Sequence, residues 1–451
     1  MEFNLFFAKK CTGGEIFGDG SFLVQSVSID SRNTEKNSLF VALKGEKTDG
    51  HNFLKEAFKN ARAAMVSKKI DFEKPYILVQ DTLKSFQILS KEIRKKINPF
   101  IFTITGSVGK STLKNLMYKS LSLVLPNLQA SEGNLNSITG LPLTLCNIKK
   151  NCKNLILEAG INKVGEMEVL SFISEPNFVC FTGVKPVHTL YLNSLENIAK
   201  EKSKLLKYLK NDGLILYPSK DPYLEKHILK YPQKKLSFGI GGDVEGEILE
   251  DKGFFGMDIK INVKGKIFSL NIPNGFLHLS TIEAAFGFFY LLDLDFNKLI
   301  ECIKNYEPLK GRLNLKIGKK GILILDDTYN ASPHSLKELL KKLKNTKIDG
   351  EKILVLGDML ELGKYEEKYH LDVGMEAAKV IDKILCFGNL SKKAGEIFSK
   401  KGKEFYFIKS HKEGAKILGK ILKKGDLVAL KGSRAMEMEK IIYLLEEDNV
   451  I

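Results

Sequence analysis

The segment around residues 100–121 constrains the fold of this chain more than any other. An apolar, β-branched run from Phe100 to Ile104 leads into a glycine-rich turn. A helical pattern follows, with one apolar face made of Leu113, Leu116, Met117 and Leu121. A strand, a glycine-rich turn and a helix that begins Lys-Ser-Thr can cradle phosphate, because the backbone approaches closely and the helix N-terminus favours negative charge. The predicted cradle comprises Thr105, Gly106, Ser107, Val108, Gly109, Lys110, Ser111 and Thr112.

Two residues of this cradle have predicted roles in binding phosphate and metal. Lys110 supplies a point cation, and Ser111 stands where a P-loop hydroxyl holds Mg²⁺. The usual motif has a glycine at the position of Ile104, so an ordinary strand-to-helix turn is the alternative. Gly-Lys-Ser in this setting favours a nucleotide site.

Bulk properties set broad limits. The length of 451 residues suggests about three domains. The formal net charge is +16, yet the lysines are spread along the whole chain and no segment interleaves them with aromatic residues, so we expect no nucleic-acid partner. No apolar run reaches the ~18 residues of a membrane span, and the six cysteines lack C-x-x-C spacing. We expect a cytoplasmic protein with reduced cysteines and no membrane partner.

Arginine is rare in this lysine-rich chain, so each arginine is informative. Its planar fork grips phosphate or carboxylate at two points, which lysine does not do. Arg32, Arg312 and Arg434 lie beside glycine, serine or a turn and are candidates for anion contacts. Arg62 and Arg94 lie in helical patterns and are expected at the surface.

Residues 1–98 form the first predicted domain. It mixes short strands with two helical stretches, Phe53–Ala64 and Leu83–Lys96. Two loops bring small, polar and cationic groups to strand ends, where α/β folds bind ligands. Their candidate substrate-binding residues are Ser31, Arg32, Lys44, Gly45, Asp49 and His51.

The second predicted domain, residues 99–312, carries polar groups after its strands. The loop Gly133-Asn134-Leu135-Asn136 is dense in amide side chains, and a later strand delivers Glu158 at its carboxyl end. An acidic residue there can complete Mg²⁺ coordination with Ser111, although a lone strand-end glutamate is more often a surface residue. The stretch Gly275–Gly287 predicts a helix packed at a domain edge.

A lysine interrupts the apolar face of the helix predicted after Ser194. That face comprises Leu195, Ile198, Ala199, Leu205, Leu206 and Leu209, and position 202 belongs to it but holds lysine. Burial disfavours a charged amine. Lys202 either extends its amine to solvent from the edge of the stripe or is a neutral amine that reacts with CO₂ to give a metal-binding carbamate. Periodicity alone leaves both interpretations open.

From residue 321 onward strands and helices alternate, which predicts a doubly wound domain over residues 313–451. Polar clusters follow three of its strands, at the ends where such sheets bind ligands. They are Asp326-Asp327-Thr328-Tyr329-Asn330, Gly357-Asp358-Met359-Leu360-Glu361 and Lys431-Gly432-Ser433-Arg434. The predicted fold class is α/β with three domains: a small α/β domain, a central P-loop domain with a parallel sheet, and a Rossmann-like domain.

Together these motifs resemble the Mur ligases, from about Ser26 to about Ile441, and most closely the branch that adds D-alanyl-D-alanine to the peptidoglycan precursor. Thr105–Thr112 is similar to the family's own P-loop, which lacks the first glycine, and Gly133–Asn136 is similar to its Gly-Asn-x-Asn loop. The three carboxyl-terminal clusters favour this branch, and the Asp-Asn-Pro-Arg box of the diaminopimelate-adding branch is absent.

The resemblance implies roles for single residues. Glu158 and His188 match magnesium ligands, and Lys202 matches the carbamylated lysine. Nucleotide contacts are implied for His278, Arg312, Asp327, Tyr329 and Asn330, and substrate contacts for Asn134, Asn136, Lys431, Ser433, Arg434 and the six loop residues of the first domain. The family's adenine-side helix usually begins His-Asn-x-x-Asn-Ala, whereas this chain has Leu277, His278 and Thr281 there.

The resemblance implies a monomeric, ATP-dependent amide ligase. ATP would phosphorylate the terminal carboxylate of UDP-MurNAc-tripeptide, bound by the first domain, and D-alanyl-D-alanine, held by the third domain, would attack the acyl phosphate. Ser111 and Glu158 would hold one Mg²⁺, and His188 and carbamylated Lys202 would help place a second. The alternatives are a ligase of the same family that adds a single amino acid, and a P-loop nucleotide switch.

Overall fold

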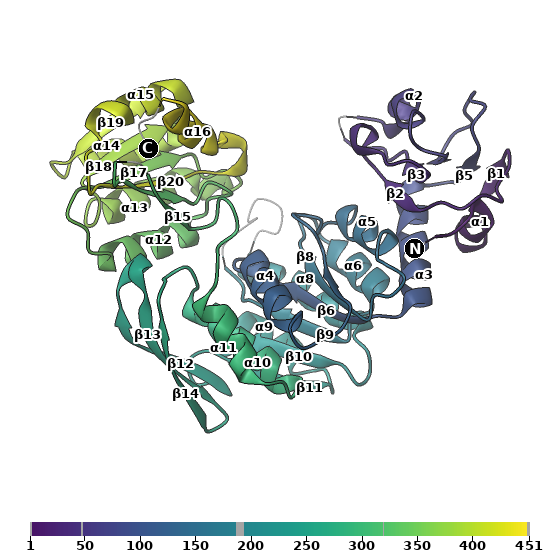
Figure 1. Cartoon of the computed structure of the whole chain (residues 1–451), viewed down its shortest axis with the longest axis horizontal. Coiled ribbons are helices and arrows are strands. Elements are labelled where there is room, and N and C mark those ends of the chain that lie inside the picture. The colour runs from purple at the N-terminus through teal and green to yellow at the C-terminus, as the bar shows by residue number, and fades with distance from the viewer. Residues whose placement is uncertain (1, 47, 186–193, 319, 449–451) are drawn as a thin grey trace.

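The computed structural model describes residues 2–46, 48–185, 194–318 and 320–448. These residues form three sheets, each built from its own part of the chain. Figure 1 shows the first and third sheets in two separate lobes, with the second sheet and its helices between and below them. No helix in the described part of the chain is both long and apolar enough to cross a bilayer.

The first sheet has five strands in the order β1-β5-β4-β3-β2. All neighbours are parallel except the pair of β1 and β5. The strands are β1 (Glu15–Phe17), β2 (Ser26–Ser28), β3 (Ser38–Val41), β4 (Ala63–Val66) and β5 (Tyr76–Leu78). The helices of this part are α1 (Leu5–Thr12), α2 (Leu54–Ala57) and α3 (Thr82–Ile97), with 3₁₀ turns η1 (Ser31–Asn33) and η2 (Gly50–Phe53). Helices α1 and α3 pack on one face, and α2 packs on the other.

The predicted helix Phe53–Ala64 is wrong beyond Ala57. The chain turns there and enters β4, all of whose side chains are buried. The alanines that favour a helix by propensity serve β4 because it lies between β3 and β5 and is covered on both faces, where small side chains fit.

The central sheet has nine strands in the order β14-β13-β12-β11-β10-β9-β6-β8-β7. The strands are β6 (Phe100–Thr105), β7 (Leu128–Ala130), β8 (Asn154–Ala159), β9 (Phe178–Phe181), β10 (Leu214–Pro218), β11 (Lys234–Phe238), β12 (Val244–Asp251), β13 (Met257–Val263) and β14 (Lys266–Ile272). The predicted parallel sheet is present from β7 to β12, and the antiparallel strands β13 and β14 extend it.

Helices cover both faces of the central sheet. One face packs against α4 (Lys110–Leu121), α10 (Leu279–Leu291) and α11 (Phe296–Lys304). The other packs against α5 (Gly140–Cys146), α6 (Glu166–Ser174), α8 (Leu195–Ser203) and α9 (Pro222–Ile228). Two 3₁₀ turns, η3 (Lys204–Tyr208) and η4 (Gly253–Phe255), complete this part. All four apolar residues predicted for the face of α4 are buried.

The helix predicted at Gly275–Gly287 is shifted in its position and in its role. It is α10, which begins at Leu279, ends at Leu291 and is buried over most of its length in the central core. Its Glu283 is only 4% exposed, and Oε1 accepts a hydrogen bond of 2.7 Å from the Gly246 amide. Burial raises the pKa of Glu283 to about 7.

This buried carboxyl makes stability depend on pH. Between about pH 4.5 and pH 7, folded Glu283 keeps a proton that the unfolded chain releases, so stability falls as pH rises through that window. We expect Glu283→Gln to flatten this slope and to stabilise the protein at pH 8 by about 2–3 kcal/mol. Urea unfolding at pH 5 and pH 8 measures the free energy of unfolding of each variant, with the substitution Glu247→Gln at an exposed position as the control. An unchanged slope in Glu283→Gln would contradict the assignment.

The third sheet confirms the predicted doubly wound domain. Its order is β15-β16-β20-β17-β18-β19, parallel except for β15 against β16. The strands are β15 (Asn314–Ile317), β16 (Leu323–Asp326), β17 (Lys352–Gly357), β18 (Lys383–Phe387), β19 (Glu404–Ile408) and β20 (Leu427–Lys431). The helices are α12 (Pro333–Asn345), α13 (Glu366–Ala377), α14 (Asn389–Ser399), α15 (His411–Ile421) and α16 (Glu439–Glu447), with η5 (Gly363–Tyr365) and η6 (Arg434–Met436).

A buried ionic contact joins the first and second parts of the chain. Arg94, predicted at the surface, has only 3% of its side chain exposed and lies 2.7 Å from Glu175 at the end of α6. Lys91, one turn earlier on α3, lies 3.0 Å from the same carboxylate. Burial opposes ionisation of Glu175, but its ion pairs with Arg94 and Lys91 lower its pKa to about 2. Lys91 and Arg94 of α3 therefore face the central part, whereas Lys84, Lys95 and Lys96 of the same helix are exposed.

The second and third parts meet through the chain around β12 and β13. The η4 residue Phe254 packs in the core of the third part, and its amide donates to the Thr346 hydroxyl at the end of α12. Phe276, just before α10, packs against the cores of both parts.

Candidate active site

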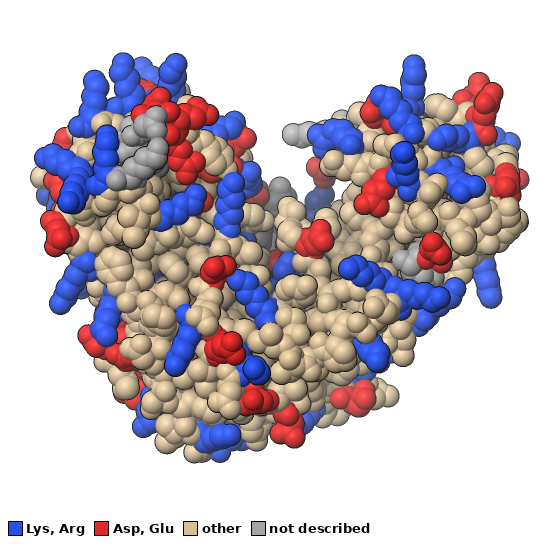
Figure 2. Space-filling view, in the orientation of Figure 1, with Lys and Arg blue, Asp and Glu red and all other residues tan. Residues whose placement is uncertain are grey.

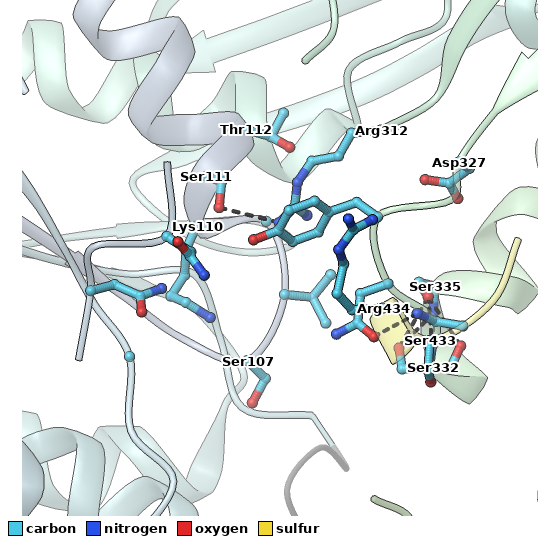
Figure 3. Close-up of a pocket in the computed structure, with 18 of the residues that line it drawn as sticks. Ser107, Lys110, Ser111, Thr112, Arg312, Asp327, Ser332, Ser335, Ser433 and Arg434 are labelled. Atoms are coloured by element: carbon cyan, nitrogen blue, oxygen red, sulfur yellow. Dashed lines mark hydrogen bonds between the residues drawn. The ribbon is translucent and has the colours of Figure 1, made fainter. Parts of the chain in front are cut away.

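A cavity of about 650 Å³ lies between the second and third parts of the chain. Figure 2 shows a wide hollow between the first and third parts, and Figure 3 shows residues of the second and third parts facing one another across the cavity. Most of the predicted site residues line it: Ser107, Val108, Gly109, Lys110, Ser111, Thr112, Asn134, Asn136, Glu158, Lys202, His278, Arg312, Asp327, Tyr329, Asn330, Lys431, Ser433 and Arg434. His188 lies outside the described residues.

The P-loop has the backbone that the sequence predicts. Gly106 has φ +146°, and a Cβ there would lie 2.0 Å from the Thr182 hydroxyl, so only glycine fits. Gly109 has φ +85° and immediately precedes α4. The free amides of the first turn of α4 and its dipole therefore face the cavity at Lys110 and Ser111, which favours an anion there.

Two lysines converge on one carbonyl oxygen of this loop. Lys110 Nζ donates to Gly106 O at 2.9 Å, and Lys202 Nζ donates to the same oxygen at 3.0 Å. Lys202 is only 2% exposed, so the interpretation in which its amine reaches solvent is wrong. Burial, and then the charge of Lys110, hold the pKa of Lys202 well below its ordinary value. A buried amine with a low pKa spends more time neutral and nucleophilic.

Glu158 is a buried acceptor rather than a surface residue. It is 3% exposed, Oε2 accepts from the Ser111 hydroxyl at 2.8 Å, and Oε1 accepts from the Asn136 amide at 2.8 Å. A carboxylate and a hydroxyl oxygen in contact are hard oxygen donors of the kind Mg²⁺ prefers. Among the described residues no cluster of three or more acidic, histidine or cysteine side chains forms a complete metal site.

Arg312 lies in the segment between α11 and β15 and reaches the P-loop. Its guanidinium donates to the Ser111 hydroxyl at 3.4 Å (Figure 3). It also lies 4.1 Å from the centre of the Tyr329 ring. The preceding Gly311 has φ +73°, and a Cβ there would lie 3.1 Å from the Tyr329 amide. Tyr329 and this glycine thus hold the arginine over the cavity.

Asp327 and Lys431 form a buried ion pair at the opposite wall. Lys431 Nζ lies 2.5 Å from Asp327 Oδ2 and also donates to the Asn330 carbonyl at 3.0 Å. Burial raises the pKa of Asp327, and the charge of Lys431 opposes that rise. The two residues, predicted as separate nucleotide and substrate contacts, are partners of each other in this structure.

The loops of the first part lie apart from this cavity. None of its six predicted substrate-binding residues lines it. His51 is held inside its own loop, with Nδ1 2.6 Å from Asp49 and Nε2 accepting from the Ser67 amide. Arg32 pairs with Asp30 at 2.8 Å but leaves 81% of its side chain exposed.

The comparison with known proteins identifies the family. A curated relative, UDP-N-acetylmuramoyl-tripeptide--D-alanyl-D-alanine ligase of Bacillus subtilis, is 31% identical over 94% of this chain and 94% of its own length. The chain belongs to the Mur ligase family. Three family models cover it in turn: the Mur ligase family catalytic domain over residues 23–104, the Mur ligase middle domain over 104–276, and the Mur ligase glutamate ligase domain over 311–434.

Solved structures agree with this membership. The MurF structure from Acinetobacter baumannii superposes with a TM-score of 0.89 at 25% identity, over 99% of both chains. The MurF ligase of Thermotoga maritima in complex with ADP gives a TM-score of 0.81 at 26% identity, over 94% of this chain and 98% of that one. The whole three-part architecture is therefore that of a Mur ligase.

Three supporting residues of this Mur ligase were missed by sequence reasoning. Lys114 on α4 donates to Ser131 O at 2.6 Å and to Gly133 O at 3.3 Å, and so holds the start of the loop Gly133–Asn136. Glu201 accepts from the Gly165 amide at 2.7 Å and fixes α8 against the start of α6. His370 on α13 accepts from the Met359 amide at 2.9 Å and holds a cavity-lining loop. Each is a polar residue at a buried helical position. A polar residue on the apolar face of a predicted helix is the sequence pattern that could have identified them.

Proposed function

We propose that this Mur ligase joins D-alanyl-D-alanine to UDP-MurNAc-tripeptide with ATP, through an acyl phosphate, in the synthesis of the peptidoglycan precursor. The observation that carries the proposal is one cavity that brings the P-loop lysine, Lys202 and Glu158 of the second domain opposite Asp327 and Arg434 of the third. The names of the curated relative and of the MurF structures support this choice of substrates.

The residues present fit ATP. The α4 N-terminus and Lys110 supply positive potential for the phosphates, and Arg312 stands beside them. Asp327 offers carboxylate oxygens to sugar hydroxyls. Bound ATP supplies the phosphoryl group that activates the carboxylate of the tripeptide.

The residues also fit a divalent cation and a carbamate. Ser111 and Glu158 would hold one Mg²⁺, and carbamylated Lys202, with His188, would help to hold a second. Bound Mg²⁺ stabilises the charge on the transferring phosphoryl group. The buried, low-pKa amine of Lys202 has the form that CO₂ requires, and its carbamate would convert a cation into an oxygen ligand.

The other residues have positioning roles in this proposal. We assign UDP-sugar binding to residues 1–98, ATP binding to 99–312 and dipeptide binding to 313–451. Asn136 orients Glu158, and the third domain covers the acyl phosphate and excludes water from it. The reaction places the enzyme in the cytoplasm, and a monomer suffices because one chain supplies every residue named.

Phosphate release tests the proposal. We expect release only when ATP, UDP-MurNAc-tripeptide and D-alanyl-D-alanine are all present. Release with a single amino acid in place of the dipeptide would favour the other ligase branch, and release with neither acceptor would favour a nucleotide switch. The nature of the third residue of the tripeptide follows from comparing diaminopimelate- and lysine-containing substrates.

A further inference from the structure

A second, smaller cavity adjoins the candidate active site. It has a volume of about 450 Å³ and shares Asn134, Tyr329 and Arg434 with the wall of the larger cavity. The segment Lys310–Gly311 and the helix α16 form other parts of its wall. We call it the side cavity. The proposed ATP and metal sites do not use it.

The side cavity lies next to the P-loop end of the larger cavity. Arg312 donates to the Ser111 hydroxyl at 3.4 Å and lies 4.1 Å from the centre of the Tyr329 ring, which lines both cavities. On the side of the second part, Lys114 of α4 donates at 3.3 Å to the carbonyl of Gly133, another lining residue. A substrate whose carboxylate is phosphorylated beside Ser111 can therefore place a neighbouring side chain in the side cavity.

Glu439, in the wall of the side cavity, has one carboxylate oxygen without a hydrogen-bond donor. Its Oε1 lies 2.6 Å from Arg434 Nη1, whereas its Oε2 is buried and has no partner among the residues that the structure describes. A buried carboxylate oxygen without a donor is costly. Arg434 keeps 61% of its side chain exposed, so it can shift and admit a donor from a ligand.

The charges of the side cavity suit a ligand that carries an ammonium group. Asp326, the other carboxylate among the described residues of the wall, accepts from the Thr328 hydroxyl at 2.6 Å and from the Gly311 amide at 3.2 Å. Both of its oxygens are therefore engaged, and Glu439 is the carboxylate with an oxygen to offer. Tyr443 lines the cavity one turn further along α16 and gives apolar surface to an alkyl chain.

We infer that the side cavity binds the side chain of the third residue of the tripeptide, with the ammonium group of that side chain donating to Glu439. This inference rests on the proposed function. Lysine and diaminopimelate, the two candidates for the third residue, both end in an amine. Diaminopimelate also ends in a carboxylate, for which Lys310 in the same wall is a cation.

Binding of this ammonium group would protect the acyl phosphate. The acyl phosphate forms on the carboxylate of the same residue, so a neutral side-chain amine could attack it. The nitrogen would bond to the acyl carbon, the bond from that carbon to the phosphate oxygen would break, and the amine would lose a proton to give a cyclic lactam and phosphate. Beside Glu439 the amine stays protonated and has no lone pair to attack with. The amine of D-alanyl-D-alanine is then the nucleophile.

Tripeptides that differ only in the third side chain test the inference. Phosphate release with D-alanyl-D-alanine gives kcat/KM for UDP-MurNAc-tripeptides that carry lysine, diaminopimelate or norleucine, which lacks the amine. We expect the wild type to favour an amine-bearing substrate over norleucine by about tenfold or more, because a hydrogen bond between charged groups is lost. The better of the two amine-bearing substrates identifies the third residue.

Variants of α16 assign the preference to Glu439. Glu439→Gln, which keeps the shape of the side chain and removes its charge, should reduce the preference to less than about threefold. Glu447→Gln, exposed on the same helix, is the matched control and should keep the wild-type preference. Thermal unfolding of each variant confirms that it is folded.

The inference and the proposed function fail in different ways. Equal kcat/KM for all three tripeptides with the wild type would overturn the inference, and so would an unchanged preference in folded Glu439→Gln. A wild type that releases no phosphate with any of the three tripeptides would instead overturn the proposed function.

Discussion

Replacement of Lys202 by alanine is expected to lower kcat by about 10³-fold or more. The substitution removes a buried group that touches the P-loop carbonyl and that, as a carbamate, would help to hold a metal ion. Loss of one group that stabilises charge in a phosphoryl- or acyl-transfer site typically costs 10²–10³ in rate, and loss of metal affinity adds to this. Steady-state release of phosphate with saturating substrates measures the effect.

Chemical rescue separates the carbamate from a plain lysine. A short carboxylate such as acetate should restore part of the activity of Lys202→Ala if the missing group is an anionic oxygen ligand. Methylamine should restore it if the missing group is a cation. Lys200→Ala is the control, because Lys200 lies exposed on the same helix and should keep full activity. Full activity of Lys202→Ala, or rescue by the amine alone, would contradict the carbamate.

Replacement of Lys431 by methionine is expected to destabilise the protein by about 3–5 kcal/mol. The substitution leaves Asp327 buried without its cation, and a lone buried charge is far more costly than a missing pair. Chemical denaturation at pH 7 measures the change in the free energy of unfolding of the third domain.

A second substitution tests the cause of that loss. Asp327→Asn in the Lys431→Met background removes the stranded charge and should recover most of the lost stability, although nucleotide binding stays weak. Lys59→Met, which breaks the exposed pair of Lys59 and Glu56, should change stability by less than about 0.5 kcal/mol. If the single and double variants were equally unstable, the ion pair would not be the reason.

The sequence located the residues that line the cavity better than the residues that hold them in place. Three features could be found because each stands out locally in the sequence. The P-loop places glycines in a turn between a strand and a helix, Glu158 is an acid directly after an apolar strand, and Lys202 is a lysine on an apolar helix face. The structure places all three in one cavity. The doubly wound third domain could be predicted because alternating strands and helices admit few arrangements.

Other features could not be predicted because they depend on contacts distant in sequence. Asp327 directly follows β16 and Lys431 is the last residue of β20, and the pairing of these two strands follows from the order of the sheet and not from either segment. Arg94 is buried only because Glu175 of another domain faces it. The composition of β4 predicts a helix. The segment is a strand in the structure because hydrophobic cores cover both of its faces.

Phe276 is partly buried and packs against two hydrophobic cores at once, and these contacts limit how the third domain can move. Any rotation of that domain on the second must either pivot near Phe276 or withdraw the ring from one of the two cores. Withdrawal would return apolar surface to water at a cost on the order of 1–3 kcal/mol. The ring also lines the cavity. A ligand bound against Phe276 would therefore contact the residue near which the second and third domains rotate relative to each other.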